Sequence, residues 1–543
     1  MQTMGTIGDY YEAKMRGTRE FPEGEYFYKH LPNTFTEVLE KAEQLPKIKV
    51  NLEQLNQLKE ILKAYHQKLG LLTPKVQENI EKIQDGVILG GQQTTIFGGS
   101  GIIGNKIAAI ATLSELSKER NNFLVPMFLV NTHDSIQPEI TSIHLPNYQS
   151  SISKPIILDG VIEGTIANKI LTNNSEWIEE NLQIIKNIFS EFRNSVEKNS
   201  QKLLMERIDH ILTFLRETYR SSTNIGEWIT LIWGIQANII NDWGVIFFPT
   251  SHPEIRKITS KGYLPFLKNR KEYLEEFNNA TNKIQDLGLR PTTGNKNEEY
   301  APFFYECPND GYRLNLKCTE NENVLYFEGK CPLNKEEYRF SINTENIELD
   351  EHIVNLVPRL DTNQALYQSI MPVYIRVSGP GEINYNAQVI PAVTKIGIQF
   401  PIYVKYTRLL YNTPWIEDIS NTLEPQSMSL FASDFFKILG SVAKARRKNN
   451  ADELSLCTNE LTDIIIEKMK QLKNIQDNSL SDIERYKSWQ FGMYDDNHQW
   501  QEVSWPWFIM AAITGLNDYL ASYRRYYSEN TPIGGIGYIN TRL

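Results

Sequence analysis

The chain has 543 residues, of which 41% are hydrophobic and 11% aromatic, and its formal net charge is −10. This length predicts roughly two to four structural units, and the apolar and aromatic content excludes a mainly disordered chain. The acidic balance excludes nucleic acid as the main partner, because phosphate binding depends on clustered positive charge.

The first residues and the cysteines suggest a compartment. Residues 1–14 are polar and lack the basic and apolar regions of a signal peptide. The longest apolar run, Trp505–Ile513, is interrupted by a proline and is shorter than the roughly 20 residues of a membrane span. Four cysteines without a C-x-x-C pair predict a reducing compartment and no disulfides. We therefore expect a cytoplasmic protein without a membrane segment.

The amino-terminal segment, residues 1–86, is predicted to be helical. Apolar residues recur at helical spacing at Leu52, Leu55, Leu58 and Leu62. We expect this segment to pack on an α/β core that covers residues 87–415.

A strand–loop–helix–strand pattern opens the predicted core. The apolar run Val87–Leu89 indicates a buried strand, which the glycines after it end. The elements expected next are a turn at 91–93, a glycine-rich loop at 98–101, a helix at 106–120 and a strand at 123–130. This order predicts two parallel strands in a covered sheet.

Further strands are predicted at 245–248, 373–377 and 401–406, and two insertions separate them. The first insertion, about 155–235, carries a helical stretch from Glu176 to Tyr219. The second, about 270–350, ends in hairpin-like segments at 312–318 and 324–329. Residues 416–543 are predicted to be helical, with apolar stripes at 454–472 and 509–527 that are typical of a core face or a dimer seam.

The glycine-rich segment is the first candidate for chemistry. Residues 99–104 match the dinucleotide pattern G-x-G-x-x-G, but they begin ten residues after the strand, and Asn105 stands where a phosphate-binding P-loop has lysine. The remaining hypothesis is an anion site made of backbone N–H groups, a helix amino terminus and Lys106. The alternative is a glycine turn that serves only close packing. Gln92 and Gln93 either bind a polar ligand or satisfy the turn.

Polar residues also follow the second strand, at Asn131, Thr132, His133 and Asp134. A histidine beside a carboxylate can act as a general base or bind phosphate, although a single histidine at a strand end is also a common structural residue. No second ligand stands at a metal spacing nearby. The cysteines of the second insertion, Cys307, Cys318 and Cys331, are separated by 11 and 13 residues, so we expect buried thiols and no metal site.

The third candidate segment follows the predicted strand 373–377. The sequence Gly379-Pro380-Gly381 predicts a tight turn. Glu382, Tyr385 and Gln388 then recur at three-residue spacing and share one face of the next helix. Such a face indicates ligand recognition or, alternatively, an ordinary solvated helix.

Together these segments resemble the BshC family, which contains the cysteine-adding ligase of bacillithiol biosynthesis. The family's first motif, G-Q-Q-x-G-L-F-x-G-P-L-Y-T-x-x-K, is matched at Gly91, Gln92, Gln93, Phe97, Gly99 and Lys106. Its E-D-H-D motif is matched at His133 and Asp134. Its G-G-P-G-E-I-x-Y-x-A-Q motif is matched at Gly379, Pro380, Gly381, Glu382, Ile383, Tyr385, Ala387 and Gln388.

The resemblance implies a Rossmann-like parallel-sheet core with two inserted connecting segments and a carboxy-terminal helical coiled-coil arm that forms a homodimer. It also implies an amide ligation of cysteine to the amino group of glucosaminyl-malate, with ATP or another nucleotide activating the carboxyl. Catalysis would then rest mainly on positioning and electrostatic stabilisation.

The expected roles divide among three groups of residues. Gly91, Gln92, Gln93, Gly99 and Lys106 would hold the phosphate-bearing group, and Lys106 is also a catalytic candidate. His133 and Asp134 would position a substrate or move a proton, with Asn131 beside them. Glu382, Tyr385 and Gln388 would recognise the amine partner, and Gly379 and Gly381 would contact the substrate or the nucleotide.

One departure affects the expected substrate. The acidic pair before the family's histidine is Asn131-Thr132 here, which removes two carboxylates. The alternatives are therefore a family member that performs another condensation in specialised metabolism, or a non-catalytic homodimer that binds a nucleotide or metabolite. An NAD(P)-dependent oxidoreductase is disfavoured by the glycine spacing.

Overall fold

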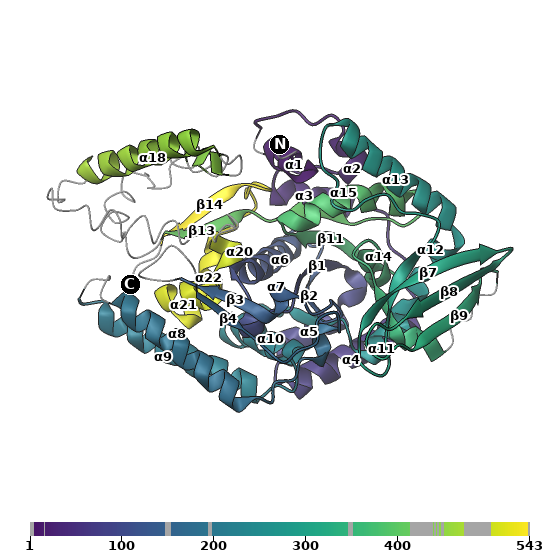
Figure 1. Cartoon of the computed structure of the whole chain (residues 1–543), viewed down its shortest axis with the longest axis horizontal. Helices are drawn as coiled ribbons and strands as arrows, with labels where there is room; N and C mark the ends of the chain where they lie inside the picture. The colour runs from purple at the N-terminus through teal and green to yellow at the C-terminus, as the bar shows by residue number, and fades with distance from the viewer. Residues whose placement is uncertain are drawn as a thin grey trace.

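The computed structural model describes residues 5–15, 17–146, 154–193, 198–345, 351–412, 438, 441–442, 445–446, 450–471 and 501–540. Its centre is a five-stranded parallel sheet in the order β12-β11-β1-β2-β5 (Figure 1). The strands are β1 (Val87–Gln93), β2 (Val125–Asn131), β5 (Ile246–Pro249), β11 (Val373–Ser378) and β12 (Ile402–Lys405). The predicted parallel-sheet α/β core is confirmed.

The order of these strands defines where a ligand can bind. From β1 the chain proceeds outward through β2 to β5, and it then returns to the other side of β1 as β11 and β12. The direction reverses between β1 and β11, and open α/β sheets bind ligands beyond the carboxyl ends of the strands at such a switch point.

The start of the core differs from the prediction in two places. Strand β1 continues through Gln93, so residues 91–93 are strand and not turn. Gly91 permits this, because a side chain there would place its Cβ 2.8 Å from Cβ of Leu129 on β2. Helix α6 (Gly101–Glu119) begins five residues earlier than the expected start at Lys106.

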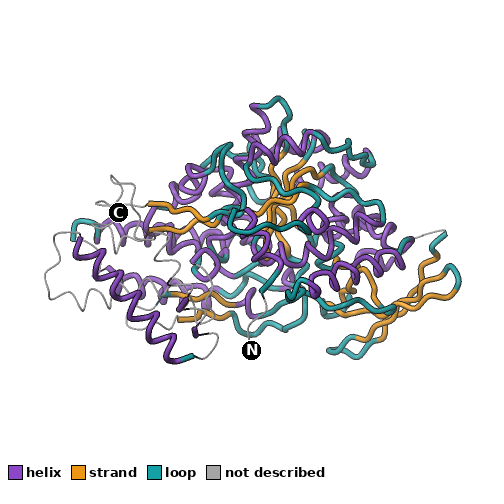
Figure 2. The backbone as a smooth tube through the Cα atoms, turned by 90° about the horizontal axis from the view of Figure 1, so that it is seen from above, coloured by secondary structure: helices purple, strands orange, loops and turns teal. Residues whose placement is uncertain are grey.

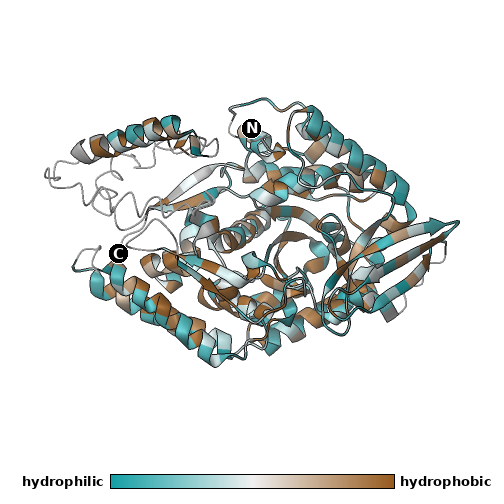
Figure 3. Ribbon diagram, viewed as in Figure 1, coloured by the Kyte–Doolittle hydropathy of each residue, from teal (hydrophilic) through white to brown (hydrophobic). Residues whose placement is uncertain are grey.

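Both faces of the parallel sheet are covered. Ile88 and Phe128 pack on one side with α6 and α15 (Pro380–Lys395), while Leu89 and Met127 pack on the other. The helices of this second side are α4 (Leu52–Lys68), α5 (Pro74–Glu81) and α11 (Pro253–Thr259). In Figure 3 the central α6 is mostly brown, whereas α13 (Arg270–Asp286) at the periphery is mostly teal.

The amino-terminal region is helical, as expected. Its first three helices lie on the α6 and α15 side of the sheet, where they bury Tyr11, Phe27 and Phe35. They are α1 (Ile7–Met15), α2 (Gly24–Tyr28) and α3 (Phe35–Glu43).

The first insertion contains two helices where one helical stretch was expected. Helices α8 (Ser175–Phe192) and α9 (Gln201–Arg220) pack along each other. A short antiparallel pair precedes them, β3 (Ser142–Leu145) with β4 (Lys154–Ile157), and α10 (Ile225–Gly234) returns the chain to the core.

The second insertion forms an antiparallel sheet in the order β10-β6-β7-β8-β9, which extends from one end of the molecule (Figure 2). The predicted hairpin is confirmed by β7 (Arg313–Asn321) and β8 (Val324–Lys330). The other strands are β6 (Tyr300–Glu306), β9 (Glu337–Asn343) and β10 (Leu356–Pro358).

The carboxy-terminal region is helical within the described residues. Gly515, with φ of 88°, divides the second predicted stripe into α21 (Trp507–Thr514) and α22 (Leu516–Tyr526). These two helices pack on α6 and α9, and β14 (Ile536–Asn540) then pairs with β13 (Arg408–Asn412).

The first stripe lies on α18 (Ala451–Gln471), where Cys457, Leu461 and Ile465 are buried. Residues 413–437 and 472–500 lie outside the described residues, and the coiled-coil arm stays a prediction. Among the helices that are described, none is long and apolar enough to cross a membrane.

Candidate active site

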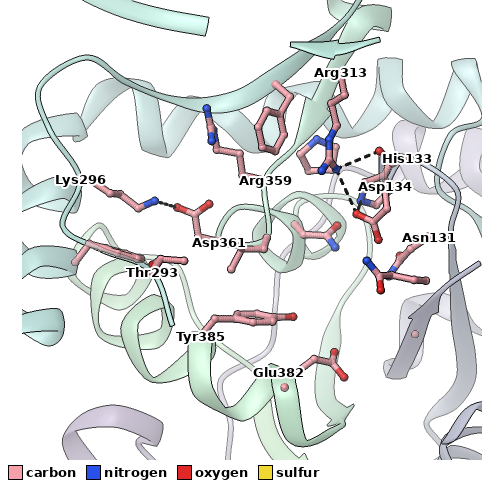
Figure 4. A pocket seen from close by; sticks show the side chains of 18 of the residues that line it. Asn131, His133, Asp134, Thr293, Lys296, Arg313, Arg359, Asp361, Glu382 and Tyr385 are labelled. Carbon is pink, nitrogen blue, oxygen red and sulfur yellow. Dashed lines mark hydrogen bonds and ion pairs between the residues drawn. The ribbon is translucent and has the colours of Figure 1, made fainter. Parts of the chain in front are cut away.

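A cavity of about 860 Å³ lies at the switch point, between the carboxyl ends of β1, β2 and β11 and the antiparallel sheet. The amino end of α15, the segment 293–300 and the segment 358–363 complete its wall. Figure 4 shows labelled side chains around one space, from the end of β2, the antiparallel sheet, α15 and the segments 293–300 and 358–363. The cavity therefore forms where the second insertion covers the edge of the parallel sheet.

Most residues predicted to form the site line this cavity. They are Gly91, Gln92, Gln93, Lys106, Asn131, His133, Asp134, Gly379, Gly381, Glu382 and Tyr385. Three segments that are far apart in the sequence thus meet at one place. Gly99 and Gln388 are the two predicted residues that do not line the cavity.

Gly99 belongs to a loop that is sealed by other parts of the chain. The indole nitrogen of Trp507 donates to the Phe97 carbonyl at 2.8 Å, and that of Trp233 donates to the Gly98 carbonyl at 3.0 Å. A Cβ at Gly101 would lie 2.8 Å from the Tyr523 hydroxyl. The glycines at the start of α6 therefore allow close packing of aromatic side chains, which was the alternative to an anion site.

Gln388 is fully buried one turn beyond Tyr385 on α15. Its amide nitrogen donates to the Thr281 hydroxyl at 2.7 Å and to the Thr293 carbonyl at 2.9 Å, and its amide oxygen accepts from Thr293 N at 3.1 Å. Gln388 thus holds the segment 293–300 against α15 and supports the cavity wall from behind.

Glu382 is the centre of a buried charge cluster at the floor of the cavity. Its carboxylate pairs with Lys106, accepts from Arg376 Nη2 at 3.1 Å, and accepts from the Gly379 N–H at 2.7 Å. Burial alone would raise the pKa of Glu382, but the two cations and the N–H group hold that pKa below its usual value. Lys106 also donates to the Gly91 carbonyl and to Gln92 Oε1, each at 2.9 Å, so it ties β1 to α15.

His133 is buried at the end of β2. Its Nδ1 lies 2.7 Å from the Thr250 hydroxyl, which donates its own proton to the Val130 carbonyl at 2.9 Å. This network assigns the histidine proton to Nδ1 and leaves a lone pair on Nε2, which is 3.9 Å from Asp134 Oδ1. Burial lowers the pKa of His133 to about 4, so the ring is neutral at pH 7.

Asp134 connects β2 to the second insertion. Its Oδ1 lies 3.3 Å from Arg313 Nη1, and the same guanidinium donates to the His133 carbonyl and to the Ser135 hydroxyl. Arg313 follows directly on a turn of the antiparallel sheet and stacks over the Phe304 ring at 4.4 Å. The position of Asp134 in the cavity thus depends on how that turn is held.

Sequence reasoning missed a second cluster on the opposite wall. Asp361 is buried and accepts from the Tyr273 and Tyr300 hydroxyls at 2.6 Å each, and from Lys296 at 2.9 Å. The three donors overcome the effect of burial and lower the pKa of Asp361. Arg359 lies beside this group, over Phe304 at 4.1 Å. These residues have irregular spacing and no motif, so no local signal marks them.

Three buried polar atoms that belong to lining residues have no hydrogen-bond partner in the described protein. They are Asn131 Oδ1, Asn363 Oδ1 and Arg376 Nη1. Arg359 donates to the Ala301 carbonyl and to Asn315 Oδ1, and none of the described carboxylates pairs with it. Buried polar groups are almost always satisfied, so these atoms need a partner from outside the protein, either a ligand or an ordered water.

The residue next to Asn131 behaves differently. Thr132 is buried behind the strand end, where its hydroxyl accepts from Ser251 N at 3.2 Å. Of the two residues that replace the family's acidic pair, only Asn131 lines the cavity. Of the two replacements in the family motif, the one at Asn131 therefore changes the lining of the cavity.

The fold and the cavity define a Rossmann-like α/β protein with a polar cavity at the switch point of its parallel sheet. Residues 11–406 match the family model described as "Bacillithiol biosynthesis BshC, N-terminal Rossmann-like domain". The chain belongs to the BshC family.

Two curated relatives carry the name "Putative cysteine ligase BshC". The protein from Staphylococcus epidermidis is 24% identical over 373 residues, which cover 65% of this chain and 61% of the relative. The protein from Desulforamulus reducens is 24% identical over 393 residues, which cover 70% of this chain and 66% of the relative. The matched part is thus less than two thirds of either relative's length.

Proposed function

We propose that this protein is an amide-forming ligase that joins cysteine, or a related amino acid, to an amine acceptor such as glucosaminyl-malate. One observation carries the proposal: the cavity presents two unpaired acceptors, Asn131 Oδ1 and Asn363 Oδ1, and one unpaired guanidinium donor, Arg376 Nη1. Each unsatisfied group costs about 1–3 kcal/mol unless a ligand pairs with it. A ligand with N–H groups and anionic oxygens, as in an amino acid, satisfies all three.

The anionic end of a substrate fits near Arg376 and Arg359. Both guanidinium groups line the cavity, and the amino end of α15 adds a positive partial charge. Six cationic side chains line the cavity against four acidic ones, which favours acidic ligands. An acceptor that carries carboxylates, as glucosaminyl-malate does, matches this balance.

An activating nucleotide fits the same end of the cavity. No heavy atom of the described residues lies within 4 Å of the position of a Cβ on Gly381, so the backbone of α15 is open to a phosphate there. Gly91, Gln92, Gln93, Gly379 and Gly381 would contact it together with Arg376. When bound, the nucleotide would activate the carboxyl group of the amino acid for the ligation.

The residues of the cavity then have distinct tasks. In the ligation the amine nitrogen bonds to the acyl carbon, the bond from that carbon to its leaving group breaks, and the amine loses a proton. His133 Nε2 carries a lone pair that can accept this proton, and Asp134 stabilises the resulting imidazolium. Asn131 Oδ1 can orient the amine by accepting one of its N–H groups. Tyr385 and Lys106 complete the floor.

The direct test is a reaction of the purified full-length protein with cysteine, glucosaminyl-malate and ATP, followed by mass spectrometry. We expect the amide product and its loss in His133→Gln and Asn131→Ala. Variant Glu328→Gln, at an exposed position on β8 that does not line the cavity, is the control and should retain activity. No product from any amino acid in a full panel would contradict the proposal.

A second candidate function is a condensation with other substrates. The observation that favours it is Asn131, a neutral amide where the family motif has a carboxylate. Thiol profiling of a deletion strain separates the two candidates. Loss of bacillithiol supports the first, whereas unchanged bacillithiol, together with turnover of a different amino acid or amine in vitro, supports the second.

A further inference from the structure

Two turns of the antiparallel sheet have the same sequence pattern. The first is Cys307-Pro308-Asn309-Asp310, between β6 and β7, and the second is Cys331-Pro332-Leu333-Asn334, between β8 and β9. Each begins with Cys-Pro and ends with Asp or Asn three residues after the cysteine. Twenty residues separate the two turns, within the range of the C-x₂-C-x₁₅₋₂₀-C-x₂-C pattern of zinc sites.

The two turns also have the same backbone geometry. In the first, Gly311 N donates to the Cys307 carbonyl at 2.8 Å, and in the second, Lys335 N donates to the Cys331 carbonyl at 3.0 Å. Gly311 and Lys335 both have positive φ, 76° and 66°. A lysine in this conformation is uncommon, which indicates that the turn is held for a reason beyond local preference.

The side chains of these turns converge. The sulfur atoms of Cys307 and Cys331 and a carboxylate oxygen of Asp310 lie within 4.8 Å of one another. Cys331 Sγ is 3.2 Å from Asp310 Oδ2, whereas Asp310 Oδ1 accepts from Tyr312 N and fixes the carboxylate. Zinc bonds of about 2.0–2.3 Å place tetrahedral ligand atoms about 3–4 Å apart, so small shifts would suffice to bind a metal.

Hydrogen-bond donors surround both sulfur atoms. Asn334 Nδ2 donates to Cys307 Sγ at 3.2 Å, and the Tyr338 hydroxyl lies 3.1 Å from the same sulfur. Backbone N–H groups of Leu333 and Asn334 donate to Cys331. Both cysteines are fully buried. A cation bound here would hold both sulfur atoms as thiolates beside the carboxylate, and donors of this kind orient metal ligands.

We propose that Cys307, Cys331 and Asp310 bind one Zn²⁺ ion, with the fourth coordination position left to water. Two thiolates and a carboxylate suit zinc better than the hard cations Mg²⁺ and Ca²⁺, which prefer oxygen ligands. Cys318 lies between the two turns in sequence but on β7, outside the cluster. Counting it among the ligands gives gaps of 11 and 13 residues, and this conceals the repeated turn.

The ion would serve the active site from outside it. Arg313 begins β7 two residues after Gly311; its N–H donates to the Gly164 carbonyl at 2.9 Å, and its guanidinium holds Asp134. Fixing residues 307–311 would therefore fix Arg313 at the cavity. The role is structural, and the inference does not depend on the identity of the reaction.

The test is metal binding by the reduced, full-length protein. We expect one equivalent of Zn²⁺ by elemental analysis, and thiolate-to-metal absorption on titration of the metal-free protein with Co²⁺. Variants Cys307→Ser and Cys331→Ser should bind more than about a hundredfold more weakly, and Asn334→Ala about 10–100-fold more weakly. The matched control is Cys318→Ser, a buried cysteine of the same sheet, which should bind as the wild type does.

X-ray absorption of the wild-type protein with Zn²⁺ tests the same claim without any variant. Two sulfur ligands and lighter atoms in the first shell are expected. The proposal is overturned if the wild type takes up no zinc after reduction, if the first shell lacks sulfur, or if Cys318→Ser loses the metal as the turn variants do.

Discussion

Helices α6 and α15 both start with a glycine-rich segment after a strand of the parallel sheet, yet only one start is open. At α6, a Cβ on Gly98 would lie 2.7 Å from Trp507 Nε1, and one on Gly101 would meet Tyr523. At α15, a Cβ on Gly381 would meet no atom of the described part of the chain within 4 Å, and the cavity lies beside it. The same residue type therefore marks close packing at one helix and access for a ligand at the other.

The groups that separate the two helix starts come from distant parts of the chain. Trp507 and Tyr523 lie more than 400 residues after the loop that they cover. A local pattern of glycines contains no information about such a cover. The comparison leads to predictions that differ for the two ends.

The largest effect is expected at the charge cluster that distinguishes the α15 end. Replacing Glu382 with Ala leaves Lys106 and Arg376 buried without their carboxylate, and breaking a buried pair costs about 3–5 kcal/mol. Urea unfolding should report this loss. The exposed pair Glu299 and Lys317 at the rim is the control, and Glu299→Ala should cost under about 1 kcal/mol. Equal losses for the two variants would contradict the buried cluster.

A somewhat smaller effect on the free energy of unfolding is expected when acid protonates the two buried histidines. Burial lowers the pKa of His133 and of His66 from 6.5 to about 4 each, so the unfolded chain binds protons that the folded chain rejects. The two neutral rings contribute to the free energy of unfolding, on the order of 3 kcal/mol for each ring. This contribution is fully present above pH 6.5 and is lost as pH falls towards 4.

Denaturant unfolding at several pH values measures this slope. The variant His133→Gln removes one ring and should lower the slope between pH 6.5 and 4, while His66 supplies the remainder. An unchanged slope in His133→Gln would show that His133 is not buried in its neutral form.

The smallest effects on stability are expected from one alanine substitution in each of the two glycine-rich segments. Gly98→Ala should destabilise by about 1–3 kcal/mol, because φ is 86° and Trp507 blocks the new Cβ. Gly381→Ala should stabilise by about 0.4–1 kcal/mol, because alanine suits a helix and finds open space. Thermal unfolding of the ligand-free proteins measures both. Changes of the same sign would remove the structural distinction between the two helix starts.

The sheet and much of the cavity could be predicted from sequence because their signals are local. The apolar runs at β1, β2 and β11 indicate buried strands, and the polar residues after them meet at one edge. Asp361, Lys296 and Arg359 could not be predicted, because tertiary packing brings the second insertion and the segment after β10 over that edge. The prediction of a turn at Gly91 was wrong. Glycine also permits β2 to approach closely, and with β2 beside it the strand β1 continues through Gln93.

The central claim is that ligands bind at the α15 end of the cavity and not at the start of α6. Calorimetric titration with ATP of the wild type, Arg359→Met and Gly101→Ala tests it most directly. We expect Arg359→Met to weaken binding by about 10–100-fold, since a hydrogen bond to a charged group contributes about 1.5–3 kcal/mol. Gly101→Ala should bind within about twofold of the wild type. Lost affinity in Gly101→Ala together with unchanged affinity in Arg359→Met would contradict the claim.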